Sequence, residues 1–395
     1  MDNLLNQDFR KELLRTDIIP RKLNEISQKY RNMFLEDFKN KVIKTELVEK
    51  CQCGSLNLEE LTKIDRFGLP FGSLICRDCG LVMTNPRMSQ ESLSYYYDKY
   101  YHPLNYGEEH LENQVALFED GQGKKIFTII KDFLPKKEKI SVLEIGAGTG
   151  NVLSEFKEEA KKENIIVEEL GTEYNNNCIN KCKEKSINTI FGNIQTVIGL
   201  NKKFDLIILS HVFEHFIDLN KELDDLKQLM VDKTLLYVEV PGLFVIHEKD
   251  YYNNSFLGYH IHAHMFNFNK DSLNNLMHMS GFESKFINEK VESVYSLKHN
   301  INGSIQNNFI KNSYSKVLNY LELLSEGILT NFYKTLKRWH ETEKSKREKY
   351  QRWNQQNNKK LEKICIQYDK VKRASYIRKI SELKELFKIL GDLKS

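Results

Sequence analysis

The sequence predicts a doubly wound α/β fold of the Rossmann-like type, and two observations lead to that prediction. An apolar run over residues 141–145 has the character of a buried parallel strand, and a helical pattern begins at Asn151. Between them stand three glycines at a spacing of two: Gly146, Gly148 and Gly150. A strand that leads through a glycine-rich turn into a helix N-terminus is how doubly wound folds bind nucleotides.

The remaining strands of a seven-stranded sheet are predicted from further apolar runs bounded by turn residues. A helix is expected over 111–136, before the glycine turn, and Pro135 ends it. The expected strands after the turn are 165–173, 188–191, 204–210 and 234–240, with closing strands within 283–302.

The glycine motif reads G-x-G-x-G, with Glu144 two positions before the first glycine. A dinucleotide fingerprint would read G-x-G-x-x-G. The observed pattern instead resembles motif I of class I S-adenosylmethionine (SAM) methyltransferases. The resemblance implies SAM as the cofactor. It places Glu173 on the ribose hydroxyls, Asn193 beside the adenine amino group and Ser210 at the end of the fourth strand, also facing SAM. A surface glutamate at a strand end is the alternative interpretation of Glu173.

Four cysteines form two short knuckles, Cys51-x-Cys53 and Cys76-x-x-Cys79, each followed by glycine. Four thiolates presented in this way predict a closed, tetrahedral, structural zinc site. The first knuckle is one residue shorter than the usual spacing. Four reduced structural cysteines are therefore the alternative that the sequence leaves open.

The segment after the second knuckle reads CGLV-x-x-NPR, then a serine and a tyrosine cluster between Tyr95 and Tyr106. It resembles the zinc-binding domain that precedes the catalytic domain in bacterial methyltransferases of sugar and surface-polysaccharide pathways. The resemblance covers about residues 50–285. It places the tyrosine region over the cofactor and substrate pocket, although we expect most of these rings to be ordinary core residues.

The candidate catalytic residues are Glu214, His215 and His264. Glu214 and His215 follow the fourth strand, where ligands of open α/β sheets bind. His264 stands where the related family carries a histidine. Either histidine can act as a general base near neutral pH, with Glu214 orienting or assisting. A neutral histidine that only fixes a loop is an equally weighted interpretation of His215.

Two features of the histidine-rich loop bear on the reaction. In a strand, His260, His262 and His264 would share one face and could bind a metal, but no carboxylate falls within the run. Related sugar C-methyltransferases carry a Glu-His pair here, whereas this chain has Ala263 before His264. They also end in a second nucleotide-binding domain, and we find no second glycine-rich turn here. Both departures favour transfer to oxygen over transfer to carbon.

The composition divides the chain into a mildly acidic body and a basic tail. Residues 330–395 contain 19 Lys and Arg against 8 Asp and Glu. This helical tail is expected to be solvated, to self-associate or to meet an anionic partner. The expected domains are a helical segment (1–48), a zinc-binding and tyrosine-rich domain (49–108), the catalytic domain (109–303) and an α-helical C-terminal extension (304–395).

The sequence thus predicts a SAM-dependent methyltransferase that acts on a sugar, nucleotide-sugar or surface-glycan hydroxyl with a histidine base. Transfer to carbon, methylation of RNA or protein, and a non-catalytic SAM-binding scaffold are the alternatives; nucleic acid is the less expected partner. We find no signal peptide pattern and no apolar run of membrane-spanning length, and we expect a cytoplasmic protein.

Overall fold

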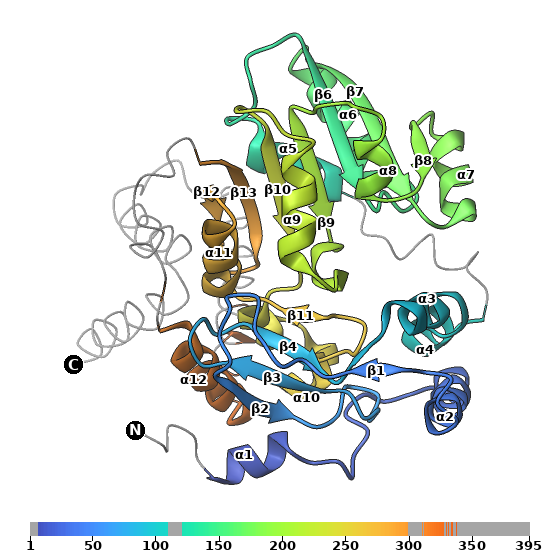
Figure 1. The fold of residues 1–395 in the computed structure, drawn as a ribbon, viewed down its shortest axis with the longest axis vertical. Coiled ribbons are helices and arrows are strands. Elements are labelled where there is room, and N and C mark those ends of the chain that lie inside the picture. The colour runs from blue at the N-terminus through green and yellow to red at the C-terminus, as the bar shows by residue number, and fades with distance from the viewer. Residues whose placement is uncertain are drawn as a thin grey trace, which may run out of the picture. The chain divides into compact units, whose positions relative to one another are not determined.

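Seven strands form the central sheet of the computed structural model, in the order β12-β13-β10-β9-β6-β7-β8 (Figure 1). The structure describes residues 7–109, 121–298, 310, 312–327, 329, 331, 333, 334 and 337. β13 runs antiparallel to both of its neighbours, and the five strands from β10 to β8 are parallel. The strands are β6 (Lys139–Ile145), β7 (Ile166–Glu173), β8 (Thr189–Phe191), β9 (Leu206–Ser210), β10 (Leu235–Glu239), β12 (Phe282–Ile287) and β13 (Glu292–Leu297).

Helices cover both faces of this sheet, as the alternation of buried side chains along the strands requires. On β6, Val142 packs into one apolar core and Leu143 into the other. The first core receives α5 (Gln122–Ile130), α6 (Asn151–Lys162) and α7 (Asn176–Glu184). The second receives α8 (Ile194–Ile198), α9 (Leu219–Lys227) and α11 (Lys270–Met279). The predicted doubly wound sheet of seven strands is confirmed.

A smaller antiparallel sheet carries the cysteine knuckles. Its order is β11-β4-β3-β2, and its strands are β2 (Leu58–Thr62), β3 (Gly72–Cys76), β4 (Val82–Asn85) and β11 (Phe266–Asn267). β11 is supplied by the chain segment that follows the histidine-rich loop, and it pairs with β4 through Phe266 and Met83. Figure 1 shows this sheet beside the central one. The two-residue strands β1 (Thr45–Glu46) and β5 (Arg87–Met88) form a separate pair.

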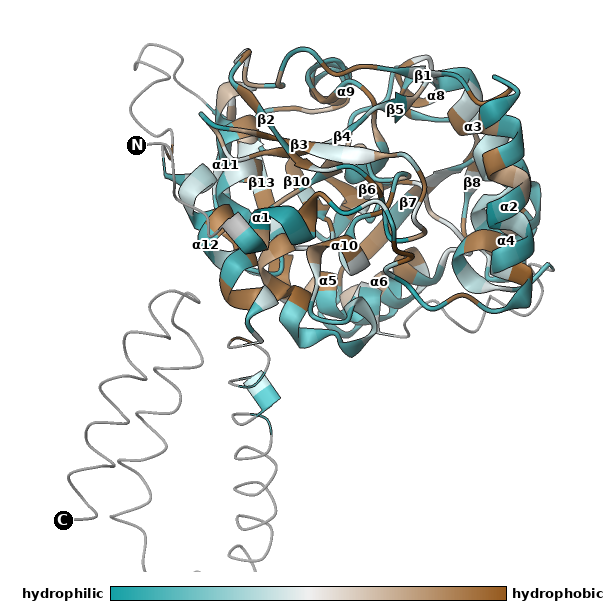
Figure 2. Ribbon diagram, turned by 90° about the horizontal axis from the view of Figure 1, so that it is seen from below, coloured by the Kyte–Doolittle hydropathy of each residue, from teal (hydrophilic) through white to brown (hydrophobic). Residues whose placement is uncertain are grey.

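Helices from three parts of the chain complete the body. Residues 1–45 were predicted to form one or two helices, and two are present. The helices are α1 (Gln7–Leu13), α2 (Glu25–Lys39), α3 (Gln90–Lys99), α4 (Tyr101–Tyr106), α10 (Phe256–Tyr259) and α12 (Ser313–Ser325). Figure 2 shows that the helices carry both hydrophilic and hydrophobic stretches, as expected of helices that pack one face on a core.

Residues 1–325 form one compact unit, and residues 326–395 form a second. The structure describes only a few residues of the second unit, so most of the basic tail lies outside the described residues, as does the first part of the expected 111–136 helix. The domain boundaries expected at 48, 108 and 303 stay predictions. No helix among the described residues is long and apolar enough to cross a membrane.

Candidate functional site

The glycine turn joins β6 to α6, and its three glycines have different roles. All three have positive φ, at 71° (Gly146), 51° (Gly148) and 75° (Gly150). A Cβ on Gly146 would lie 2.6 Å from Val212, and one on Gly150 would lie 3.0 Å from the Cys182 sulfur. A Cβ on Gly148 would meet nothing within 4 Å. Gly146 and Gly150 are therefore needed for packing, while Gly148 presents bare backbone to open space, as a bound cofactor requires.

Two carboxylates stand at the strand ends beside this turn. Glu144 is buried, and its Oε2 has no hydrogen-bond partner among the described residues. Burial and the charge of Glu173 raise the pKa of Glu144 well above its usual range. The Oε2 of Glu173 accepts from the Gly148 N–H (2.9 Å), and its Oε1 accepts from the N–H groups of Tyr174 and Asn175. Both carboxylates thus lie where the SAM prediction places cofactor-binding groups.

Two exposed aromatic rings lie at the carboxyl ends of β7 and β8, and neither was among the predicted site residues. Tyr174 follows β7 and Phe191 ends β8; they are 60% and 58% exposed, and their ring centroids lie 5.6 Å apart. Large exposed rings at the carboxyl ends of two adjacent strands offer a flat surface to a planar base. Asn193, the predicted adenine contact, uses its side-chain oxygen to cap α8 at the Thr196 N–H (3.3 Å).

Ser210 ends β9 and accepts a hydrogen bond from Gln122 Nε2 at 3.0 Å. The same amide nitrogen donates to Glu239 at the end of β10 (2.5 Å), and Lys125 lies 2.6 Å from that carboxylate. Gln122 and Lys125 belong to α5, so this helix lies beside the carboxyl ends of β9 and β10.

Opposite the glycine turn, three segments distant in sequence form a polar cluster that we call the acceptor centre: Tyr97, Glu214, His215 and His264. Tyr97 comes from α3, Glu214 and His215 lie in the short helix η3 (Phe213–His215), and His264 lies in the loop before β11. One ligand-type atom from each of Glu214, His215 and His264 lies within 4.8 Å of the others. Because Val212 packs on Gly146, this loop borders the cofactor turn.

The hydrogen bonds of His215 define which of its nitrogens can accept a proton. Nδ1 lies 2.9 Å from the Ala263 carbonyl oxygen and 2.8 Å from the Tyr97 hydroxyl. A carbonyl oxygen can only accept, so we assign the ring proton to Nδ1. In the neutral ring Nε2 then carries the lone pair, and it lies 3.8 Å from Glu214 Oε1.

His264 packs edge to face against His215, with ring centroids 4.9 Å apart. Burial, His215 and the positive charge of Arg66 hold the pKa of His264 well below its usual range, so its imidazole is neutral at physiological pH. Glu214 is buried, and its Oε2 has no partner among the described residues. The structure therefore brings all three predicted catalytic residues together.

His211 also belongs to this region, although the sequence analysis did not select it. Its ring nitrogens lie 3.8 Å from Glu214 Oε1 and 3.6 Å from Glu239 Oε1. Desolvation alone would lower the pKa of His211, but the two carboxylates outweigh it and raise that pKa to about 10. Its position directly after Ser210, at the end of a central strand, was the available signal.

The other two histidines of the alternating run do not face His264, because residues 262 and 263 form a turn and not a strand. His260 Nε2 lies 3.1 Å from the carbonyl oxygens of Phe71 and Gly72. His262 Nδ1 lies 2.6 Å from Asp65 Oδ2, and both side chains are fully buried. A metal held by these three histidines on one face is therefore excluded by the backbone.

The tyrosine cluster divides as expected between core and site. Tyr96 and Tyr100 are fully buried. Tyr95, Tyr100 and Lys99 all contact the Asp37 carboxylate. Among the described residues of this cluster, Tyr97 is the one whose side chain hydrogen-bonds a predicted catalytic residue, His215.

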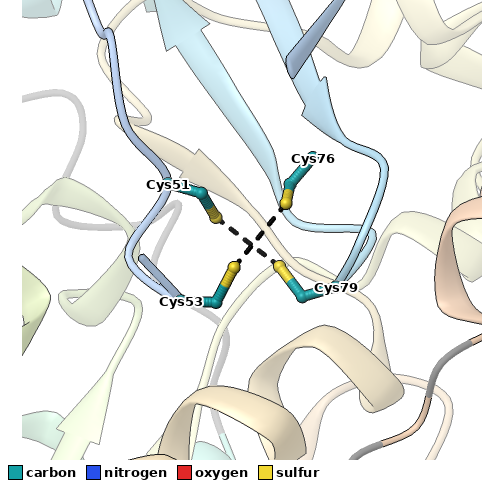
Figure 3. Close-up of side chains that lie close together, drawn as sticks. All are labelled: Cys51, Cys53, Cys76 and Cys79. Atoms are coloured by element: carbon teal, nitrogen blue, oxygen red, sulfur yellow. Dashed lines mark hydrogen bonds between the residues drawn. The ribbon is translucent and has the colours of Figure 1, made fainter. Parts of the chain in front are cut away.

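The four cysteine sulfurs converge on one point (Figure 3). The Cys51 and Cys79 sulfurs lie 3.5 Å apart, and those of Cys53 and Cys76 lie 3.7 Å apart. Tetrahedral zinc with Zn–S bonds of about 2.3 Å requires sulfurs separated by about 3.8 Å. The short first knuckle therefore closes onto the second without a change in the backbone, and the set fits a structural zinc ion.

Comparison with known proteins supports the cofactor half of this site. Residues 118–284, fewer than half of the chain, match the family model Methyltransf_23, described as a methyltransferase domain. No curated protein matches the chain. The seven-stranded order, the glycine turn and this match define a class I SAM-dependent methyltransferase domain. The chain thus contains a SAM-dependent methyltransferase domain.

Solved methyltransferase structures of low sequence identity are similar to parts of this chain. The CurJ carbon methyltransferase is 17% identical, with a TM-score of 0.38, over 50% of this chain and 61% of its own. The plantazolicin methyltransferase BamL, solved with a triazolic desmethylPZN analog and SAH, is 18% identical over 62% and 84%, with a TM-score of 0.35. A TehB-like methyltransferase from Corynebacterium glutamicum is 14% identical over 53% and 100%, with a TM-score of 0.33. This chain thus spans about three fifths of the CurJ chain.

Proposed function

We propose that the protein transfers a methyl group from SAM to a hydroxyl of a sugar, nucleotide-sugar or surface-glycan intermediate. The observation that carries this proposal is the acceptor centre, where two histidines and a buried glutamate stand beside the cofactor turn. A hydroxyl must lose its proton as it attacks, and a neutral imidazole near the reacting oxygen can accept that proton. The sugar class itself rests on the resemblance of residues 50–285.

Each group of residues at the site has a separate proposed role. SAM, when bound, supplies an electrophilic methyl group, and Glu144, Gly148 and Glu173 would hold its nucleoside part. His264, neutral because of its lowered pKa, is the first candidate for the base, and His215 Nε2 is the second. Glu214 can orient either ring and stabilise the imidazolium that forms. Holding donor and acceptor in this geometry supplies much of the rate enhancement.

Zinc, if bound by the four cysteines, would be structural. All four ligand positions are taken by sulfur, so no open position remains for a substrate. We propose the cytoplasm as the location, where such thiols stay reduced and available to a metal.

Transfer to carbon is a second candidate, which the structure supports through Glu214. The related C-methyltransferases carry a Glu-His pair in the loop where this chain has Ala263 and His264. Here Glu214 supplies a carboxylate within 4.8 Å of a His264 nitrogen from another part of the chain. The absence of a glutamate at position 263 therefore does not leave His264 without a carboxylate neighbour.

The test uses methyl-labelled SAM with the purified full chain and a size-fractionated extract of the host cell. Label in small anionic metabolites or polysaccharide supports the proposal. The ¹³C shift of the product methyl distinguishes an O-methyl from a C-methyl group. His264→Gln should abolish most of the labelling, whereas His278→Gln, a half-buried histidine on α11, should not.

Label in RNA or protein would contradict the sugar proposal and give the basic tail a role in substrate binding. In that case labelling should fall steeply with salt and be lost on deletion of residues 330–395. No label in any fraction, together with tight SAM binding, would favour the scaffold alternative.

A further inference from the structure

Two arginines lie near the acceptor centre and have no carboxylate partner among the described residues. The guanidinium carbons of Arg21 and Arg66 lie 5.8 and 5.0 Å from the centroid of the same ring, that of Phe67. The Arg21 N–H donates to the Arg66 carbonyl oxygen, so the two backbones are also in contact. We call Arg21 and Arg66 the arginine pair.

The hydrogen-bonding capacity of the pair is largely unused. Arg66 Nη2 donates to Asn105 Oδ1 at 2.7 Å, but its Nε is buried and has no partner in the described part of the chain. Burial and the repulsion from Arg66 lower the pKa of Arg21 to about 10. Two guanidinium groups that repel each other at a partly buried position are costly without an anion, and an anion between them would remove that cost.

Neighbouring charges of the protein do not neutralise the pair. Asp65, next to Arg66 in the chain, is saturated by His262 and by the N–H groups of Phe67 and Leu69. Arg31, on α2, donates to the carbonyl oxygens of Phe67 and Gly68 instead of offering its guanidinium to a ligand.

One row of aromatic rings leads from the acceptor centre to the arginine pair. The Tyr97 hydroxyl contacts His215, and the Tyr97 ring lies 5.0 Å from that of Tyr101. The Tyr101 ring lies 6.2 Å from that of Tyr106, which is close enough to Arg21 to affect its pKa.

Two further tyrosines, Tyr252 and Tyr259, are buried and support the packing behind Arg21. The Tyr259 hydroxyl donates to the Pro241 carbonyl oxygen at 2.8 Å, and burial raises the pKa of Tyr259 well above its usual range. The rings of Tyr252 and Tyr259 lie 5.1 Å apart, and Tyr252 acts on the pKa of Arg21.

We infer that the arginine pair binds a phosphate or diphosphate group of the methyl acceptor, with the row of rings from Tyr97 to Tyr106 between that group and the acceptor centre. The inference rests on the proposed function, since it assumes that the acceptor occupies the centre at His215 and His264. It narrows the substrate class to sugars that carry a phosphate, as they do when attached to a nucleotide or lipid carrier. Two arginine forks at one place suit phosphate oxygens, which accept several hydrogen bonds at once.

The test is calorimetric titration of inorganic pyrophosphate into the full-length protein saturated with SAH. Arg21→Gln and Arg66→Gln should each weaken pyrophosphate binding by about tenfold or more, because the loss of a hydrogen bond to a charged group changes a binding constant by about that factor. The matched control is Lys22→Gln, which removes the same charge from the exposed neighbour of Arg21 and should leave the affinity unchanged. Arg66→Lys keeps the charge but not the fork and should give an intermediate loss.

The outcomes separate this inference from the proposed function. Equal affinity in the wild type and both Gln variants, with SAH binding intact, would overturn the arginine site, and so would binding of glucuronate in preference to pyrophosphate. Stronger binding of UDP than of pyrophosphate would support a nucleotide carrier, and stronger binding of geranyl diphosphate a lipid carrier. The assay needs no methyl transfer, so its result stands even if the labelling experiment identifies a different acceptor.

Discussion

The cofactor side and the acceptor side of this enzyme are built in different ways. The cofactor side uses consecutive strand ends: the glycine turn after β6, Glu173 at the end of β7 and Phe191 at the end of β8. Each of its groups is fixed by the strand that precedes it. The acceptor centre combines α3, η3 and the loop before β11, and its contacts join residues 48 and 118 positions apart in sequence. A parallel sheet therefore positions the candidate cofactor groups, whereas long-range packing assembles the acceptor centre.

Gly148→Asp is expected to have the largest effect on SAH affinity and activity, and it changes the cofactor side alone. A side chain there would enter the space left for SAM, and its charge would oppose Glu173. We expect SAH affinity to fall at least about 100-fold, with loss of activity. Calorimetry with SAH measures it. The control is Gly281→Asp, which also has positive φ and open space and so carries the same backbone strain. Equal loss in both variants would mean that strain, and not cofactor exclusion, is responsible.

His264→Gln tests the acceptor side alone. We expect kcat to fall about 100-fold, the usual contribution of a general base, with SAH affinity unchanged. The lowered pKa of His264 adds a pH signature. A base with a lowered pKa loses its proton at lower pH, so the wild-type rate should hold on acidification until the pH falls through that pKa, well below 6.5. Unchanged turnover in the variant would assign the base to His215.

Cys53→Ser tests whether the two sides are coupled through the small sheet. Metal analysis should show about one zinc per wild-type chain and less in the variant, because one of four ligands is weakened. We expect the melting temperature to fall by about 5 °C or more. Turnover should fall while SAH still binds. Cys178→Ser, outside the cluster, is the control. Absence of zinc from the wild type would mean that the four cysteines are only reduced structural thiols, and full zinc content in the variant would mean that Cys53 is not a ligand.

The smallest expected effect is on the pH dependence of stability, through His211 at the boundary between the two sides. Its folded pKa of about 10 lies above the unfolded value near 6.5, so its contribution to stability is full below pH 6.5 and is lost as the pH rises through 10. Glu239→Gln should lower that midpoint, which NMR titration of the His211 ring can follow. A midpoint near 6.5 in the wild type would contradict the pairing of His211 with Glu214 and Glu239.

The sequence located the candidate cofactor residues because their signals are local, and their contact with SAM stays a prediction. Gly146, Glu144 and Glu173 follow from strand patterns and spacing, and the structure places them at one edge. It could not predict that Tyr97, alone among the tyrosines, reaches His215, because that depends on how α3 packs on the loop after β9. The family resemblance selected His264, whereas strand alternation would have put His260, His262 and His264 on one face; the turn at 262–263 breaks that alternation. Arg21 and Arg66 belong to no recognisable sequence motif, so the sequence did not indicate them.

The pairing of β11 with β4 limits which segments of this protein can be exchanged in a chimera. The Thr84 hydroxyl donates to the His264 carbonyl oxygen, and the Thr84 N–H donates to the Met265 carbonyl oxygen. A chimera that exchanges only the cysteine-bearing segment would bring a foreign strand against β11 and change the backbone that presents His264. The backbone that presents His264 is therefore set jointly by residues 50–88 and 260–268, whereas the strand ends of β6, β7 and β8 are fixed within the central sheet and could be exchanged separately.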